Sequence, residues 1–196
     1  QANHCWIQTR EGRFEDQALP LGLALSGDGL AEAGMGVARG DVNGDGLEDL
    51  LLTHLAQQTH TLYVATRRGR APSFDDGTLR AGIAAQTLDK TGFGVALADL
   101  DLDGALDIIA VHGRVLRGPL EDGAGEPMHW RRYAERDLVM LGGTKRFRAT
   151  DAGDFDADAE TSRGLALGDL DGDGDLDALV TTAAGRVRLF EAQGPP

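Results

Sequence analysis

The sequence predicts an all-β fold built from repeated small sheets, and the repeats themselves are the main evidence. Three segments align without a gap, at residues 34–54, 92–112 and 162–182. Each holds a strand of small residues, an acidic loop and an aliphatic strand, in that order. Short aliphatic runs bounded by turn residues are typical of strands, and a helical period is sustained nowhere in the chain.

Two further elements recur between these segments. A short apolar strand comes first in each unit, and a block that contains a phenylalanine follows it. The phenylalanine blocks surround Phe14, Phe74 and Phe147. The acidic loops begin at Asp41 and, 58 and then 70 residues later, at Asp99 and Asp169. The longer interval contains an insertion rich in glycine and proline, which predicts an excursion loop.

The repeats define one domain over residues 1–196, with the units and the insertion as its parts. We expect repeat units at residues 6–54, 62–112 and 138–182, a closing strand at 187–190 and an insertion loop at 114–136. Four-stranded sheets repeated radially make a β-propeller, which needs about 4–8 blades to close. Three units and one strand therefore predict propeller blades in a partial propeller, or in a fragment of a larger one.

Charge and cysteine content exclude several classes of function. The chain carries 32 acidic against 19 basic residues, a net charge of −13, so nucleic acid and anionic membrane surfaces are not expected partners. No apolar run approaches the ~20 residues that span a bilayer, so direct membrane insertion is not expected either. A single cysteine, Cys5, excludes an intrachain disulfide framework or a zinc finger.

The acidic loops share a spacing that is typical of a cation site. Carboxylate or amide side chains stand at positions 1, 3, 5 and 9, and glycine stands at position 6. Oxygen ligands on alternate residues converge when the backbone curls around a hard cation, and the glycine permits the sharp turn. The predicted ligands, including the carbonyl group at position 7, are Asp41, Asn43, Asp45, Leu47 and Asp49; Asp99, Asp101, Asp103, Ala105 and Asp107; and Asp169, Asp171, Asp173, Asp175 and Asp177.

The ligand count predicts about three Ca²⁺ sites. Four side chains, the position-7 carbonyl and a water supply the six to eight oxygens that Ca²⁺ prefers, although the residues leave Mg²⁺ or Mn²⁺ open. Position 12, a glutamate in an EF-hand, falls here on Leu52, Ala110 and Val180, so the loops belong to β-hairpins. The alternative is that they are plain aspartate–glycine turns. The second loop differs at position 4, where Leu102 replaces glycine.

Two other groups of residues have competing interpretations. His54 and His112 occupy equivalent positions after the aliphatic strands, and ordinary turn residues are favoured over a transition-metal pair. Trp130 and Tyr133 flank two arginines in the insertion, which favours a contact with another protein, or else a loop that folds back on its own sheet.

Catalytic motifs are absent from the sequence. None of the serines, Ser26, Ser73 and Ser162, lies in a G-x-S-x-G motif, and neither H-E-x-x-H nor a phosphate-binding P-loop occurs. We therefore expect a non-catalytic binding or assembly module. An accessory subunit of a larger complex is the alternative, and a calcium-dependent enzyme acting on polysaccharides is a third, less favoured one.

The loops and the glycines before them resemble the FG-GAP/VCBS repeat of integrin-type β-propellers. Gly92, Phe93 and Gly94 carry the phenylalanine–glycine element itself, and residues 163–171 are similar to the ASPIC/UnbV branch of that family. The resemblance implies propeller blades with structural Ca²⁺, a periplasmic or secreted location, and a role in adhesion or assembly. Its implied partners are proteins, including subunits of a larger envelope or membrane complex. The departure is length, since family propellers commonly have about seven blades.

Overall fold

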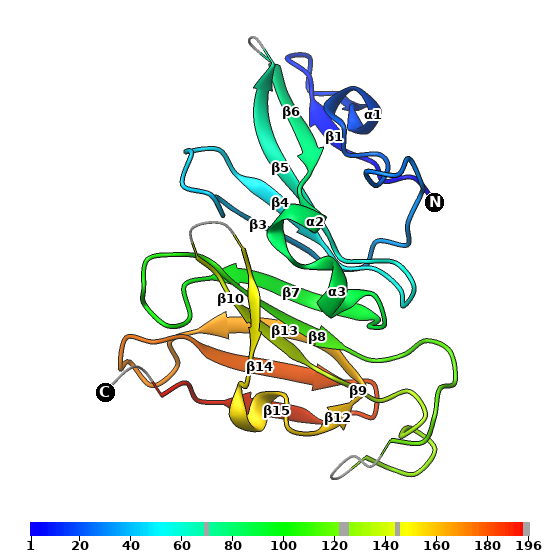
Figure 1. Ribbon diagram of the computed structural model, residues 1–196, viewed down its shortest axis with the longest axis vertical. Helices are drawn as coiled ribbons and strands as arrows, with labels where there is room; N and C mark the ends of the chain where they lie inside the picture. The colour runs from blue at the N-terminus through cyan, green and yellow to red at the C-terminus, as the bar shows by residue number, and fades with distance from the viewer. Residues whose placement is uncertain (69–70, 122–125, 144–145, 194–196) are drawn as a thin grey trace.

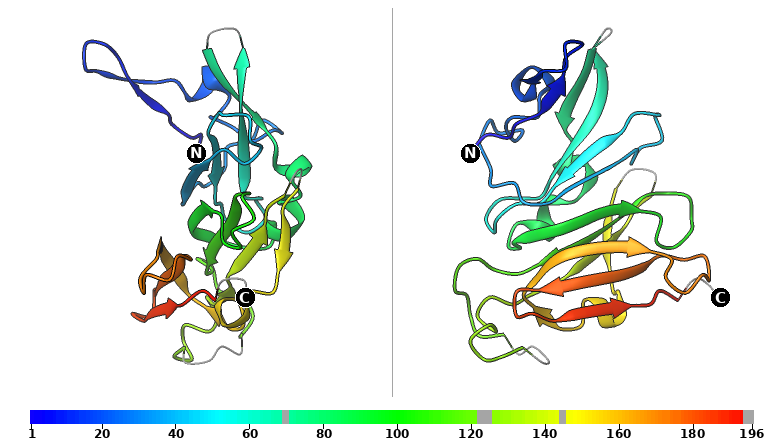
Figure 2. Two further views of the ribbon diagram at one scale, coloured as in Figure 1. Left: turned by 90° about the vertical axis from the view of Figure 1, so that its left-hand side faces the viewer. Right: turned by 180° about the vertical axis from the view of Figure 1, so that it is seen from behind.

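The computed structural model describes residues 1–68, 71–121, 126–143 and 146–193, and it confirms the all-β prediction. Three antiparallel sheets follow one another along the long axis of the molecule (Figure 1). A two-stranded hairpin lies at one end and the third sheet at the other (Figures 1 and 2). No helix in the described part of the chain is long and apolar enough to cross a bilayer.

Each full sheet is a four-stranded meander that begins at a small-residue strand. The first sheet is ordered β3 (Val37–Gly40), β4 (Asp49–Leu52), β5 (Thr61–Arg68) and β6 (Ala71–Asp76). The second is ordered β7 (Gly92–Ala98), β8 (Asp107–His112), β10 (Leu138–Leu141) and β11 (Arg148–Thr150). The third contains β13 (Ser162–Gly168), β14 (Asp177–Thr182) and β15 (Val187–Phe190).

The remaining elements are short. The first hairpin pairs β1 (Trp6–Gln8) with β2 (Phe14–Asp16), and a two-residue bridge pairs β9 (Glu135–Arg136) with β12 (Ala159–Glu160). The helical turns are α1 (Ala18–Leu21), α2 (Thr78–Ala81), α3 (Ala84–Thr87) and the 3₁₀ turn η1 (Gly153–Phe155). Gly22 and Gly82 end α1 and α2 in the left-handed conformation, with φ of 83° and 78°.

The sheets are offset from the repeat units drawn from the sequence. The strand at Thr61 and the block around Phe74 pair with the acidic hairpin that precedes them, as β5 and β6 of the first sheet. Each of the units 62–112 and 138–182 therefore contributes strands to two sheets. The stretch 187–190 is the third strand of the last sheet, paired with β14.

The apolar core lies between the sheets. One cluster, which includes Leu51, Leu62 and Ile108, fills the space between the first and second sheets. A second cluster, built on Val111 and Val180, fills the space between the second and third. Strand β8 is buried along its whole length because it has a sheet on either side, which explains why its sequence reads as a continuous aliphatic run.

Small residues allow the sheets to meet through their first strands. Strand β7 packs against β3 on one side and β13 on the other. A Cβ on Gly36 would overlap the carbonyl oxygen of Phe93, and one on Gly94 would lie 2.7 Å from the Cβ of Leu165. Glycine at these positions lets neighbouring backbones approach closely. The small-residue strands are therefore the contact surfaces between the sheets.

The insertion folds back on itself between β8 and β10. The N–H of Arg114 donates to the carbonyl of Tyr133 at 2.7 Å, and that of Gly118 donates to Arg132 at 2.8 Å. The predicted loop 114–136 is thus described at residues 114–121 and 126–136, and its part at 122–125 lies outside the described residues. The Trp130 and Tyr133 rings meet edge to face at 5.9 Å.

Candidate metal centres

The three acidic loops occupy equivalent places in the fold. Each connects the first two strands of its sheet, between β3 and β4, β7 and β8, or β13 and β14. All three lie along the same side of the molecule, the left side in Figure 1 and the right side in the reverse view of Figure 2. The repeat therefore presents three hairpin loops in one row.

Backbone N–H groups hold the carboxylate at position 1 of each loop. In the first loop, the two Asp41 oxygens accept from Gly44 at 2.8 Å and Gly46 at 2.7 Å. In the third loop, Asp169 accepts from Gly172 at 2.7 Å and Gly174 at 3.2 Å. These bonds curl the backbone around the first carboxylate.

The same arrangement recurs in the second loop and at the later positions. Asp99 accepts from the N–H of Asp103 at 3.0 Å and of Gly104 at 3.0 Å. Positions 3 and 5 each accept the N–H two residues further on, for example Asp103 from Ala105 at 2.8 Å. The position-7 residues therefore donate their N–H groups to position 5, namely Leu47, Ala105 and Asp175.

Position 9 differs from the others because its aspartate is buried in every loop. Both carboxylate oxygens of Asp49, Asp107 and Asp177 accept backbone N–H groups. One donor is the residue at position 2 of the loop. The other belongs to the third strand of the same sheet or to the residues directly after that strand. For Asp107 the distances are 2.8 Å to the N of Leu100 and 2.6 Å to the N of Gly142. This aspartate thus ties the loop to its sheet.

The carboxylates gather most closely in two of the loops. Oxygen atoms of Asp99, Asp101 and Asp107 lie within 4.8 Å of one another, as do those of Asp169, Asp171 and Asp173. The first loop brings together no three carboxylates in this way within the described residues, and its position 3 is the amide of Asn43. Asp103 and Asp177 lie outside the two groups.

The electrostatics of the loops favour a hard cation. Hydrogen bonds from the backbone, first of all from Gly46, lower the pKa of Asp41, and the N–H of Asp175 lowers that of Asp173. Burial instead raises the pKa of Asp49 and Asp107. Asp41 and Asp173 are therefore anionic at neutral pH, and a donor set made only of oxygen suits Ca²⁺ or Mg²⁺ rather than thiophilic metals.

Comparison with known families covers the first two loops. Residues 41–110 match the FG-GAP-like repeat. The matched segment runs from the first position of loop 1 through the first sheet and into β8, so it includes a complete loop-to-loop repeat. The third acidic loop lies outside the match, yet it has the same hydrogen bonds at positions 1 and 9. No curated protein matches the chain.

The structure corrects the interpretation of the histidines. His54 and His112, expected as turn residues, are fully buried, and so is His60. The Nε2 atoms of His60 and His112 lie 3.1 Å apart, which joins the first sheet to the second. Strand register places Asp137 and Val187 where His60 stands in the first sheet, so no repeated histidine marked His60 as the partner of His112.

Proposed function

We propose that the chain is a non-catalytic, calcium-binding module of β-propeller type that binds other proteins, in adhesion or assembly, outside the cytoplasm. The observation that carries the proposal is the threefold recurrence of one loop geometry, with carboxylates already oriented by backbone N–H groups. The match to the FG-GAP-like repeat supports an interaction module rather than an enzyme. The similarity of residues 163–171 to the ASPIC/UnbV branch supports a periplasmic or secreted location.

Calcium would be structural in these loops. Positions 1, 3 and 5 supply exposed oxygens, and position 9 anchors the loop to the sheet while its carboxylate borders the site, as Asp107 does beside Asp99 and Asp101. About three sites are proposed, one for each loop. A cation at each site would offset the repulsion between carboxylates that the turn alone brings together. Extracellular modules bind Ca²⁺ with a Kd of about 10⁻⁴–10⁻³ M, which fits a location outside the cytoplasm.

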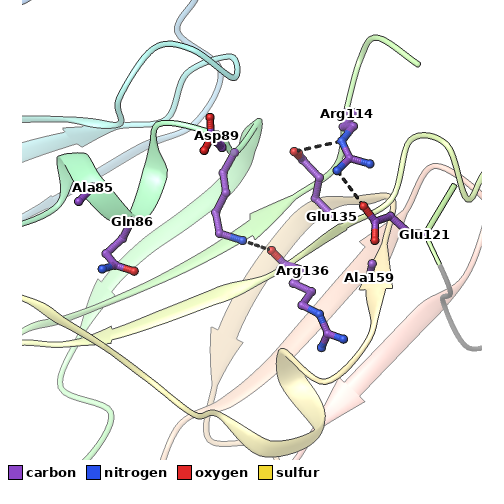
Figure 3. A pocket seen from close by; sticks show the side chains of 9 residues that line it. Ala85, Gln86, Asp89, Arg114, Glu121, Glu135, Arg136 and Ala159 are labelled. Carbon is purple, nitrogen blue, oxygen red and sulfur yellow. Dashed lines mark hydrogen bonds and ion pairs between the residues drawn. The ribbon is translucent and has the colours of Figure 1, made fainter. Parts of the chain in front are cut away.

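The insertion is the proposed protein-binding surface, because it is both anchored and exposed. Hydrogen bonds attach it to the body of the molecule: the N–H of Thr91 donates to Glu135 at 2.9 Å, and that of Thr161 donates to Glu126 at 3.1 Å. Within the insertion, Arg114 contacts Glu121 at 3.0 Å and Glu135 at 3.6 Å (Figure 3). Beyond this anchor, Leu116 and Met128 are 79% and 74% exposed. Exposed apolar side chains on a fixed support favour a contact with another protein.

A second candidate function is a permanent subunit of a larger extracytoplasmic complex, including one attached to a membrane. Apolar side chains are exposed at both ends of the molecule, which favours this alternative. Trp6 and Phe14 are exposed on the first hairpin, and Val187 and Leu189 are exposed on β15. Apolar surfaces of this kind are normally covered by a partner.

Thermal unfolding with and without divalent cations tests the proposal. In excess chelator, then with millimolar Ca²⁺ or Mg²⁺, we expect a large rise in the unfolding midpoint with Ca²⁺ alone. A site at about ten times its Kd contributes about 1.4 kcal/mol, which in a chain of this size corresponds to a rise of about 3–6 °C. Light scattering on the same samples tests the second candidate, which a monodisperse monomer would contradict.

Two matched variants locate the effect in the loops. Asp173→Asn keeps an oxygen to accept the N–H of Asp175 but removes a charge from the third loop, so it should reduce the calcium-induced rise. Asp154→Asn makes the same charge change at an exposed position outside the loops and should leave the rise unaltered. An absent rise, or an equal rise with Mg²⁺, would contradict the calcium sites.

A further inference from the structure

A pocket of about 670 Å³ opens beside the first sheet, apart from the acidic loops. Its walls come from the segment after α1, the turn before β5, and the helices α2 and α3. The side chains that matter to its chemistry are Asp28, Leu30, Glu32, Leu79, Arg80 and Leu88. Acidic and apolar groups thus share one cavity with the basic Arg80.

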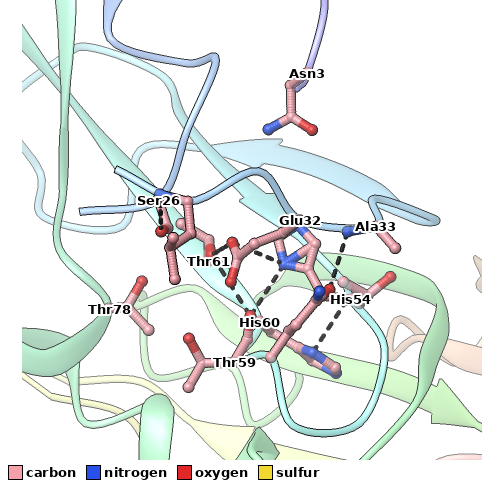
Figure 4. A network of polar contacts seen from close by, with 12 residues as sticks. Asn3, Ser26, Glu32, Ala33, His54, Thr59, His60, Thr61 and Thr78 are labelled. Carbon is pink, nitrogen blue, oxygen red and sulfur yellow. Dashed lines mark hydrogen bonds and ion pairs between the residues drawn. The ribbon is translucent and has the colours of Figure 1, made fainter. Parts of the chain in front are cut away.

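Glu32 is a nearly buried charged group of this pocket, with a side chain only 10% exposed. One of its oxygens accepts from the hydroxyl of Thr61 at 2.9 Å and lies 3.5 Å from Nδ1 of His54 (Figure 4). Burial lowers the pKa of His54 to about 4, so this ring is neutral at pH 7. Nδ1 of His54 also lies 3.0 Å from the carbonyl oxygen of Thr59, to which its N–H can donate a hydrogen bond.

Glu32 consequently lacks a cationic partner. No lysine or arginine among the described residues forms an ion pair with it, although Arg80 lines the same pocket. Desolvation raises the pKa of Glu32, and the charges of Asp76 and Asp28 raise it further. A buried carboxylate is normally paired with a cation, because an unpaired charge is costly to remove from water.

Three leucines line the same pocket. Leu30, Leu79 and Leu88 are exposed at its rim, with Leu79 at 79%. Burial of an alkyl stem against these side chains would favour binding, because it removes apolar surface from water. The lining therefore complements a ligand with a positive head and an apolar stem.

We propose that this pocket binds a protonated alkylamine, with the ammonium group at Glu32 and the stem against the leucines. The ammonium supplies the missing countercharge, and its three N–H donors can reach several acceptors at once. A lysine side chain of a protein partner and a free aliphatic amine share this chemistry. The pocket is separate from the FG-GAP-like loops, so this site does not depend on calcium binding.

Titration with small probes, followed by NMR chemical shifts and calorimetry, tests the site. Pentylammonium and Nα-acetyl-lysine methylamide should bind, while pentanol and pentanoate should bind at least about tenfold more weakly, because only the cations pair with the buried carboxylate. If the lysine derivative binds more tightly than pentylammonium, the ligand is a lysine side chain of a protein. If pentylammonium binds more tightly, the ligand is a free amine. Equal binding of pentanol and pentylammonium would overturn the proposal.

Two variants with opposite expected effects complete the test. Glu32→Gln removes the charge but keeps an acceptor for Thr61, and should weaken amine binding about tenfold. Arg80→Gln removes a like charge from the wall and should tighten binding about two- to threefold. Amine binding unchanged in both variants would refute the site. The exposed Arg80 side chain makes its variant informative even where the Glu32 substitution impairs folding.

Discussion

The buried histidines show how single side chains couple the first two sheets. His60 and His112 stack with ring centroids 5.3 Å apart, and their Nε2 atoms share one hydrogen bond. Burial lowers the pKa of His60 to about 3 and that of His112 well below its usual value. The pair is therefore neutral in the folded protein, with one ring donating to the other. Protonation of both rings would place two positive charges side by side.

Acid should accordingly destabilise the protein. Unfolded histidine titrates near pH 6.5, so below that pH the unfolded chain binds more protons than the folded one at His54, His60 and His112. Each histidine lowers the free energy of unfolding by about 1.4 kcal/mol per pH unit as the pH falls. Asp137, whose pKa burial raises to about 7, acts in the opposite direction because its folded form takes up a proton earlier.

Denaturant unfolding at several pH values between 7.5 and 5 measures this balance. The lowered pKa values of the three histidines predict a net loss of stability as the pH falls, which Asp137 and the carboxyl groups of Glu32, Asp49 and Asp107 reduce. His60→Gln should reduce the slope of unfolding free energy against pH by about one proton. His129→Gln, at an exposed position in the insertion, is the control and should leave the slope unchanged. A wild-type stability that is flat over this range would contradict the account.

The acidic hairpin occurs three times in the chain, and the three copies differ at position 4 of the loop. Gly44 and Gly172 adopt positive φ values of 73° and 83° there, and Leu102 adopts 59° in the second copy. The left-handed conformation costs an L-residue about 1–2 kcal/mol, whereas glycine adopts it without that penalty. Leu102 is mostly exposed, so it gains little packing in return. The backbone of the hairpin, rather than the side chain, therefore dictates this conformation.

Leu102→Gly should stabilise the protein. Relief of the positive φ outweighs the greater flexibility that glycine gives the unfolded chain, for a net gain of about 0.5–1 kcal/mol. The unfolding midpoint should rise by about 1–4 °C in a chain of this size. The converse variant, Gly172→Leu, places a side chain at the same position of the third loop and should lower the midpoint. A lower midpoint for Leu102→Gly would show that Leu102 makes a contact that stabilises the fold.

The whole molecule is held together by contacts between the first strands of successive sheets. Gly36, directly before β3, faces the carbonyl of Phe93 on β7, and the hydroxyl of Thr53 donates to that same carbonyl at 2.9 Å. Backbone is harder to displace than a flexible side chain, so even one added methyl group must separate the sheets. The packing of the three sheets therefore depends on the absence of a Cβ at this position.

Gly36→Ala should destabilise the protein by about 1–3 kcal/mol, the typical cost of overpacking a close contact. Gly168→Ala is the matched control, because a Cβ there would lie 3.8 Å from the nearest side-chain atom, on Leu170, and its φ is not positive. The control should change stability by less than about 0.5 kcal/mol. Denaturant midpoints at constant m-value measure both, and equal effects of the two substitutions would contradict this view of the interface.

Local sequence patterns were sufficient to predict the hairpins and their acidic loops. Alternating aspartates with glycine at positions 4 and 6 act within nine residues, so their hydrogen bonds to Asp41 and Asp169 follow from short-range geometry. The aliphatic strands and the small-residue strands were equally visible, because their neighbours in the sheet are also their neighbours in the chain. The all-β fold follows from the same short-range patterns.

Contacts between distant residues had no such signal. The partner of His112 is His60, 52 residues away, and the second donor to Asp107 is Gly142, 35 residues away. The pocket at Glu32 likewise forms only when the segment after α1 meets α2 and α3. Repeat patterns specify what each strand pairs with locally. The burial of histidine depends on how successive sheets pack. The double hydrogen bond at position 9 and the unpaired carboxylate depend on contacts between segments far apart in the chain, which no local pattern contains.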